Sequence, residues 1–143
     1  MTEPFVRVGV AVVVRRNGRL LMGLRKGSHG AGTWSIPGGS LQPGETIAEC
    51  AARELVEETG VAEPNDIELL GCTNRVYAAE NGQHFTTVYV LAMVWPEEEP
   101  RVMEPDKCER WEWRDRDDVH GRLFEPLANI LRERGTYAIW GPR

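Results

Sequence analysis

The sequence predicts an α/β domain in which helices pack on a mixed β-sheet. Two apolar runs flank Asn17-Gly18, the segment from Thr46 to Thr59 carries the capping signals of a helix, and further strand-like segments precede a final helix. Strand-rich segments before and after a helix are typical of layered α/β folds. We therefore expect one sheet with helices packed against it.

The first predicted element is a β-hairpin. Val6 to Arg16 and Leu20 to Arg25 are apolar runs, and the Asn-Gly pair between them favours a tight turn. Trp34 to Ile36 has the composition of a short strand, which we expect to end at Pro37-Gly38-Gly39. The remaining glycine- or proline-containing stretches nearby, Gly27 to Thr33 and Ser40 to Glu45, are expected to be loops.

The predicted helix runs from Thr46 to Thr59. Thr46 is suited to the N-cap, and Glu49 three residues later completes a capping box. Gly60 follows where a left-handed cap would end the helix. The apolar stripe contains several alanines, so the helix is expected to pack closely on the sheet.

Four more elements follow in the second half of the chain. Ile67 to Val76 and Phe85 to Val94 are predicted strands joined near Asn81-Gly82. Glu109 to Trp113 alternates polar and aromatic residues, as an edge or half-buried strand does. Leu123 to Arg134 has the pattern of an amphipathic helix.

Composition predicts a single domain over residues 1–143. The chain has 41% apolar residues, enough to fill one core, and no repeat or linker divides it. The net charge of −5 argues against binding to long nucleic acids, whose phosphates attract basic surfaces. The longest apolar run, Val8 to Val14, is far shorter than the roughly 20 residues of a membrane span. We expect no membrane partner.

The cysteines and the first residues lead us to expect a cytoplasmic protein. Cys50, Cys72 and Cys108 form no CxxC pair, and their odd number argues against a disulfide scaffold. Met1 to Arg7 contains Glu3 and Pro4 and lacks the apolar core of a signal peptide.

Three glutamates of the predicted helix form a candidate metal site. Glu54, Glu57 and Glu58 are three and four residues apart, so they lie on one helical face. Arg53 is spaced to pair with Glu57. Carboxylates without nitrogen or sulfur ligands suit Mg²⁺ or Mn²⁺. Taken alone, the cluster is equally compatible with a solvated acidic face.

The spacing around this cluster resembles a family signature. Gly39 is followed after five residues by Glu45, and after seven more by Arg53-Glu54-Leu55-Val56-Glu57-Glu58-Thr59-Gly60-Val61. This segment, residues 39–61, resembles the Nudix box GX5EX7REUXEEXGU, in which U is aliphatic. The resemblance implies a Nudix α/β/α sandwich with a mixed β-sheet. It also implies hydrolysis of a nucleoside diphosphate linked to another group, with Mg²⁺ or Mn²⁺ as cofactor.

The same resemblance implies roles for individual residues. Glu54, Glu57 and Glu58 match the carboxylates that bind metal and activate water, with Gly38 supplying a carbonyl ligand. Arg53 matches the residue that orients the glutamates, and Glu45 the accessory acidic position. The general base differs among family members, and Glu54 is our first candidate.

Segments outside the box are similar to the MutT-like, nucleotide-sanitising branch of the family, which includes a human hydrolase of thiopurine nucleotides. They include Leu24-Arg25-Lys26-Gly27-Ser28 and the segment from Glu104 to Trp113. The similarity implies a homodimeric pyrophosphohydrolase that converts a nucleoside triphosphate to the monophosphate and pyrophosphate. Predicted substrate-binding residues are Arg25, Lys26, Thr87, Lys107 and Phe124.

Each of these positions has a simpler alternative. Arg25, Lys26 and Lys107 could be ordinary surface charges, and Phe124 could be a core residue of the last helix. Glu104 or Glu109 could supply a further metal ligand or lie on an acidic surface. Glu125 stands where the MutT-like relative has tryptophan, so its base specificity does not carry over.

Two other functions are compatible with the sequence. One is hydrolysis of dinucleoside polyphosphates, ADP-ribose or nucleotide sugars. Tyr77 favours the dinucleoside branch, whereas the absence of proline from Gly71 to Glu80 disfavours ADP-ribose. The other is a non-catalytic nucleotide sensor, which the complete set of box glutamates disfavours.

Overall fold

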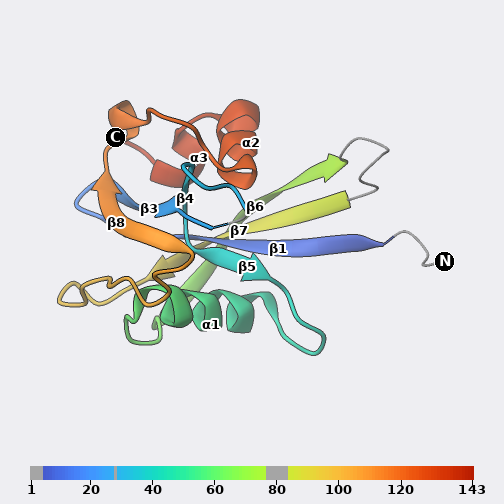
Figure 1. Cartoon of the computed structure of the whole chain (residues 1–143), viewed down its shortest axis with the longest axis horizontal. Helices are drawn as coiled ribbons and strands as arrows, with labels where there is room; N and C mark the ends of the chain where they lie inside the picture. Colours follow the sequence, from blue (N-terminus) through green and yellow to red (C-terminus); the bar gives the residue numbers. More distant parts are fainter. Residues whose placement is uncertain (1–4, 28, 77–83) are drawn as a thin grey trace.

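The chain folds into three layers, with strands between a helix on one side and two helices on the other (Figure 1). The structure is a computed structural model that describes residues 5–27, 29–76 and 84–143. The turn predicted at Asn81-Gly82 lies outside these residues. This arrangement confirms the predicted α/β sandwich.

One sheet has the strand order β5-β1-β7-β6, in which β1 and β7 are parallel and the other pairs antiparallel. The sheet is therefore mixed, as predicted. Its strands are β5 (Gly38–Ser40), β1 (Val6–Val13), β7 (His84–Met93) and β6 (Asp66–Val76). The sequence did not predict β5, because proline and two glycines are unfavourable in a strand interior. They are tolerated here because β5 is a short edge strand.

The second sheet is antiparallel and centres on β3 (Arg19–Arg25). Strand β3 pairs with β2 (Arg15–Arg16), β4 (Trp34–Ser35) and β8 (Cys108–Arg114). Asn17 and Gly18 have φ values of 52° and 76°, as the predicted tight turn requires. The hairpin is confirmed, but its first strand is divided after Val13, so the hairpin joins the two sheets.

Alternating residues of β1 fill two separate cores. Val10 and Val12 are buried with Leu55 of the helix α1 (Ile47–Thr59). Ala11 and Val13 are buried on the opposite face with Leu127 and Ile130 of α2 (Glu125–Arg134). A strand covered on both faces needs a nearly continuous apolar run, which explains the valine-rich sequence of β1.

Helix α1 has the ends that the sequence predicts. Thr46 accepts a hydrogen bond from the Glu49 backbone N–H, and the Glu49 side chain accepts one from the Thr46 N–H, each 3.1 Å long. Gly60 caps the other end with a φ of 71°. Cys50, Ala51 and Leu55 are buried, so the predicted close packing on the sheet is confirmed.

The last part of the chain differs from the prediction in two ways. Helix α2 begins at Glu125, two residues later than expected, because Phe124 is extended and its backbone N–H donates to the Trp34 carbonyl. A short helix α3 (Tyr137–Trp140) and a 3₁₀ turn (Arg116–Asp118) were not predicted. Among the described residues, no helix has the length and apolar character needed to cross a membrane.

Replacing Thr46 with alanine should destabilise the protein by about 1 kcal/mol, because it removes the hydrogen-bonding side chain of the capping box. Urea unfolding should show a lower midpoint with an unchanged slope. Thr46→Ser keeps the hydroxyl and is the matched control. Equal stability of the two variants would contradict a stabilising cap.

Candidate active site

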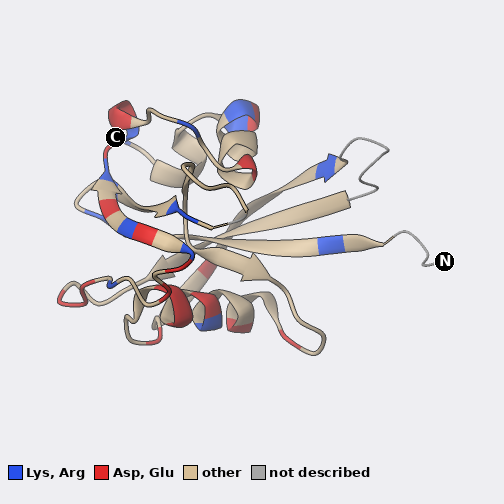
Figure 2. Ribbon diagram, in the orientation of Figure 1, with Lys and Arg blue, Asp and Glu red and all other residues tan. Residues whose placement is uncertain are grey.

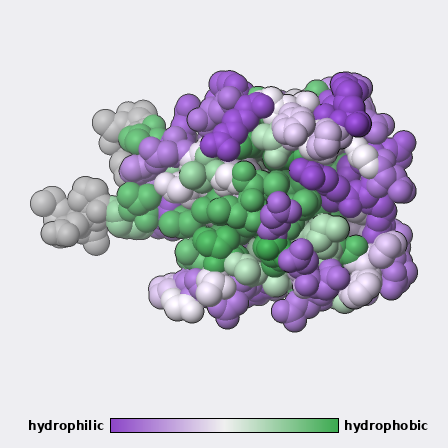
Figure 3. Space-filling view, turned by 180° about the vertical axis from the view of Figure 1, so that it is seen from behind, coloured by the Kyte–Doolittle hydropathy of each residue, from purple (hydrophilic) through white to green (hydrophobic). Residues whose placement is uncertain are grey.

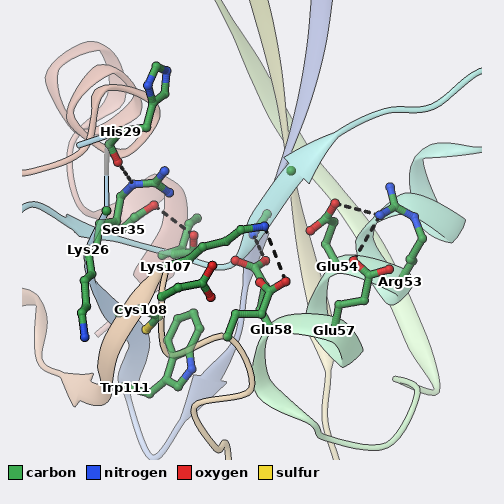
Figure 4. A pocket seen from close by; sticks show the side chains of 18 of the residues that line it. Lys26, His29, Ser35, Arg53, Glu54, Glu57, Glu58, Lys107, Cys108 and Trp111 are labelled. Atoms are coloured by element: carbon green, nitrogen blue, oxygen red, sulfur yellow. Dashed lines mark hydrogen bonds and ion pairs between the residues drawn. The ribbon is translucent and has the colours of Figure 1, made fainter. Parts of the chain in front are cut away.

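A cavity of about 710 Å³ lies between α1, the end of β3 and the segment that leads into β8. One wall carries Glu54, Glu57 and Glu58 from α1, and another carries Lys26 and His29 (Figure 4). Figure 2 shows the acidic residues of α1 gathered along the helix. The helical spacing that suggested a shared face thus brings the three glutamates to one cavity.

Two of these glutamates, Glu54 and Glu58, lie close to the backbone of β5. The Gly38 N–H donates to Glu58 Oε2 at 2.8 Å. A Cβ atom at Gly39 would lie only 2.2 Å from Glu54 Oε1. A side chain at residue 39 would therefore displace the Glu54 carboxylate from its position. Glu57 is more open, with 51% of its side chain exposed.

Burial destabilises the ionised forms of Glu54 and Glu58. Desolvation raises the pKa of Glu58 to about 8, and the nearby charges of Glu54 and Glu104 act in the same direction. The Gly38 N–H and the charge of Arg25 oppose this rise. Burial also raises the pKa of Glu54, although Arg53 stabilises its ionised form. A cation in the cavity would therefore stabilise the ionised forms of Glu54 and Glu58.

Arg53 links the glutamates to the loop that precedes the helix. Its Nε lies 2.6 Å from Glu45 Oε2, and its Nη1 lies 2.8 Å from Glu54 Oε1 and 3.4 Å from Glu57 Oε2. The hydrogen bonds from Arg53 lower the pKa of Glu45 to about 2. This geometry fits the predicted orienting role of Arg53 and a supporting role for Glu45.

The donor set fits a hard divalent cation. Carboxylates and a backbone carbonyl are ligands that Mg²⁺ and Mn²⁺ prefer, and the closely approaching backbone at Gly38 and Gly39 leaves no side chain in the way. Within the described residues, no three acidic, histidine or cysteine side chains are arranged so that they could hold a metal ion by themselves. Waters and substrate phosphates commonly complete such magnesium sites.

Three of the predicted substrate-binding residues lie at the cavity. Arg25, Lys26 and Lys107 all line it. Arg25 is half-buried, whereas Lys26 and Lys107 are exposed. Lys107 Nζ lies 3.7 Å from Glu104 Oε2, so Glu104 also belongs to the cavity wall. Of the two acidic residues left open by the sequence, Glu104 lines the cavity and Glu109 does not.

Thr87 and Phe124 are not among the described residues that line this cavity. Thr87 is buried on β7, opposite Thr73 of β6 and Gly9 of β1. Phe124 packs against Arg25, while the neighbouring Glu125 is exposed. Their predicted contact with the base stays a prediction. Tyr77, which favoured the dinucleoside polyphosphate branch, lies outside the described residues.

Sequence reasoning did not single out Trp111 and Gly23 as cavity residues. Both line the cavity, and a Cβ atom at Gly23 would lie 2.6 Å from the Trp111 ring. The two residues are paired across β3 and β8. In the sequence, the only signal for this part of the cavity was the alternation of polar and aromatic residues in Glu109–Trp113. The pairing of Gly23 with Trp111 could not be predicted, because it depends on the register between two distant strands.

Comparison with known protein families identifies the family of the chain over most of its length. The NUDIX domain model matches residues 4–134. The chain belongs to the Nudix family. A MutT NUDIX hydrolase from Burkholderia pseudomallei has a similar structure, with a TM-score of 0.80, 34% identity, and coverage of 91% of this chain and 98% of that one.

Curated relatives share shorter segments with this Nudix chain. An oxidized purine nucleoside triphosphate hydrolase from Danio rerio is 50% identical over 50 residues, which are 35% of this chain and 32% of the relative. An ADP-ribose pyrophosphatase from Methanocaldococcus jannaschii is 30% identical over 87 residues, 61% of this chain and 51% of the relative. The chain thus spans about a third to a half of the length of these relatives.

The Glu45–Arg53 contact should make stability depend on pH. Glu45 has a lowered pKa in the fold, about 2 against 4.5 for the free group, so its ion pair contributes fully above pH 4.5. This contribution is lost as the pH falls from 4.5 towards 2. The stability difference between the native protein and Glu45→Gln should therefore shrink over that range.

Unfolding by urea at a series of pH values measures this difference. Glu63→Gln removes the same charge from an exposed side chain and is the matched control. A Glu45→Gln deficit that stays constant down to acid pH would contradict the ion pair.

Proposed function

We propose that this Nudix chain is a metal-dependent nucleoside triphosphate pyrophosphohydrolase. It converts a ribo- or deoxyribonucleoside triphosphate and water to the monophosphate and pyrophosphate. The observation that carries the proposal is the cavity, which is lined both by the box glutamates and by Arg25, Lys26 and Lys107. Such a pairing of metal-binding and phosphate-binding groups suits a polyphosphate substrate.

Glu54, Glu57 and Glu58, with the Gly38 carbonyl, would hold Mg²⁺ or Mn²⁺. A bound divalent ion would neutralise phosphate charge and lower the pKa of a water molecule. Glu54 is our candidate for accepting the proton of the attacking water, and Arg53 holds its carboxylate at 2.8 Å. Arg25, Lys26 and Lys107 would bind the phosphate oxygens and orient the chain of phosphates.

A second substrate class has specific support. The ADP-ribose pyrophosphatase from Methanocaldococcus jannaschii matches a longer segment of this chain than the Danio rerio triphosphate hydrolase does. The same metal site would serve either substrate, because both contain a phosphoanhydride. The two classes differ in which bond is cleaved and in what the rest of the cavity must accommodate.

A substrate panel with Mg²⁺ distinguishes these proposals. The panel contains normal, oxidised and methylated triphosphates, ADP-ribose, nucleotide sugars and diadenosine polyphosphates, with products identified by mass-resolved chromatography. Monophosphate plus pyrophosphate from a triphosphate supports the first proposal. Release of AMP from ADP-ribose or the linked dinucleotides alone supports the second.

Glu58→Gln should lower turnover by about a hundredfold or more, because it removes a ligand charge without changing the side-chain shape. Excess EDTA should likewise abolish turnover and leave the thermal unfolding transition unchanged. Near-normal turnover of Glu58→Gln with Mg²⁺ would contradict its metal-binding role. Glu63→Gln, on the exposed surface, is the charge-matched control.

We also propose that the protein forms a homodimer through the apolar face of the β1-β7-β6 sheet. Strand register places four rows of side chains on the face that α1 partly covers. None of them is Asp, Glu, Lys or Arg: Val6, Val8, Val10, Val12, His84, Thr86, Val88, Val90, Val76, Asn74, Cys72 and Leu69. Figure 3 shows apolar residues gathered into a band across one face of the molecule.

A second copy suits this face because two chains of net charge −5 would meet there without bringing Asp, Glu, Lys or Arg side chains together. Leu69, Val76 and Val6 are 67%, 65% and 52% exposed, so their burial would favour association.

Light scattering of the native protein should give the mass of two chains, and that of Leu69→Glu should give the mass of one. Tyr137→Glu, at a 67% exposed residue of α3, is the control. A monomeric native protein would contradict the proposal.

The three free cysteines fit a reducing compartment, and we propose a cytoplasmic location.

A further inference from the structure

Arg25 and Arg53 line the same cavity but are held by different kinds of neighbours. Arg53 contacts the carboxylates of Glu45, Glu54 and Glu57, so its charge is balanced within the protein. Arg25 instead lies over the ring of Phe124, with its Cζ 3.8 Å from the ring centroid. An aromatic face attracts a guanidinium without accepting its in-plane hydrogen bonds.

The guanidinium of Arg25 retains donors for a ligand. Its Nε donates to the His29 carbonyl at 3.1 Å, the only hydrogen bond that its side chain makes to the described residues. Burial lowers the pKa of Arg25, and the nearby charge of Glu58 counteracts this. Since an arginine remains protonated near neutral pH, the two terminal nitrogens present positive charge at the cavity.

Gly30, in the loop that follows β3, packs closely against the contact between Arg25 and Phe124. A Cβ atom at Gly30 would lie 2.7 Å from Phe124 Cδ1 and 3.1 Å from Arg25 Nε. Gly30 also has a φ of 69°, which side chains rarely adopt. The backbone N–H of Arg25 donates to Thr33, and the Gly32 N–H donates to the Arg25 carbonyl. The loop thus encloses Arg25 and Phe124 together.

Phe124 is itself held in place by two parts of the fold. Its N–H donates to the Trp34 carbonyl at 2.9 Å, and its carbonyl accepts from the Ala128 N–H at 3.0 Å. The buried Tyr89 hydroxyl donates to the Pro126 carbonyl in the first turn of α2. The backbone that carries the ring is therefore fixed relative to both the second sheet and α2.

We infer that Phe124 is a positioning residue for phosphate binding, which holds the Arg25 guanidinium in the cavity without neutralising it. A carboxylate in its place would hold Arg25 equally well but would compete with the phosphate for its donors. This role differs from the base contact that the sequence suggested for Phe124. The inference rests on the proposed function, because it assigns Arg25 to the phosphates of that substrate.

Inorganic pyrophosphate tests the inference, because it has no base. Its affinity is measured by calorimetry with Mg²⁺ for the native protein, Phe124→Leu, Phe124→Tyr, Arg25→Gln and the double variant Arg25→Gln/Phe124→Leu. Leucine keeps an apolar side chain but removes the aromatic face, whereas tyrosine retains it. Thermal unfolding checks that each variant is folded.

Phe124→Leu should weaken pyrophosphate binding about threefold to thirtyfold, the range expected for loss of a cation–π contact. Phe124→Tyr should restore most of the affinity. The double variant should bind no more weakly than Arg25→Gln alone, because Phe124 acts through Arg25.

Other results would overturn the inference. If Phe124→Leu binds pyrophosphate normally but nucleotides poorly, Phe124 contacts the base. Additive losses in the double variant would mean that Phe124 does not act through Arg25. Absence of pyrophosphate binding by the native protein would remove the phosphate role of Arg25.

The proposed function is judged separately, from the products of the native protein in the substrate panel. Cleavage of linked dinucleotides alone, together with the expected pyrophosphate results, would reject the triphosphate substrate and retain the positioning role.

Discussion

The crowding of negative charge at one end of α1 is the constraint on which the site depends. Glu54 and Glu58 are partly withdrawn from water, and Glu104 approaches them from another segment. Ionised carboxylates in such a place destabilise one another unless positive charge is near. Arg53 provides part of it by contacting Glu45, Glu54 and Glu57. The remaining imbalance makes the cavity suited to cations.

This constraint explains why glycines occupy strand β5 beside the helix. Gly38 donates its N–H to Glu58, and at residue 39 a side chain would collide with Glu54. The backbone therefore approaches the carboxylates directly. A less open backbone would displace the glutamates and weaken the arrangement that Arg53 supports.

The two sheets bring the other half of the site to the glutamates. Strand β1 packs against α1, and the Asn17-Gly18 turn carries the chain into β3, which ends at Arg25. Arg25 is thereby delivered to the cavity from the second sheet. Its contact with Phe124 then connects the cavity to the first turn of α2, on the opposite side of the sheets from α1.

The sequence by itself determined the local features of this protein. The Thr46 capping box, the Gly60 cap and the Asn17-Gly18 turn depend on neighbouring residues, and each is present as predicted. The convergence of Glu54, Glu57 and Glu58 follows equally from helical spacing. The resemblance to the Nudix box rests on the same short-range pattern.

Only the tertiary structure decided which distant residues meet. Gly38–Ser40 becomes a strand because β1 offers a partner edge, and Trp111 lines the cavity because β8 pairs with β3. The contact between Arg25 and Phe124 joins residues 99 positions apart, as their numbers 25 and 124 give. Such contacts depend on strand register and on packing between layers, and neither is encoded in the spacing of nearby residues.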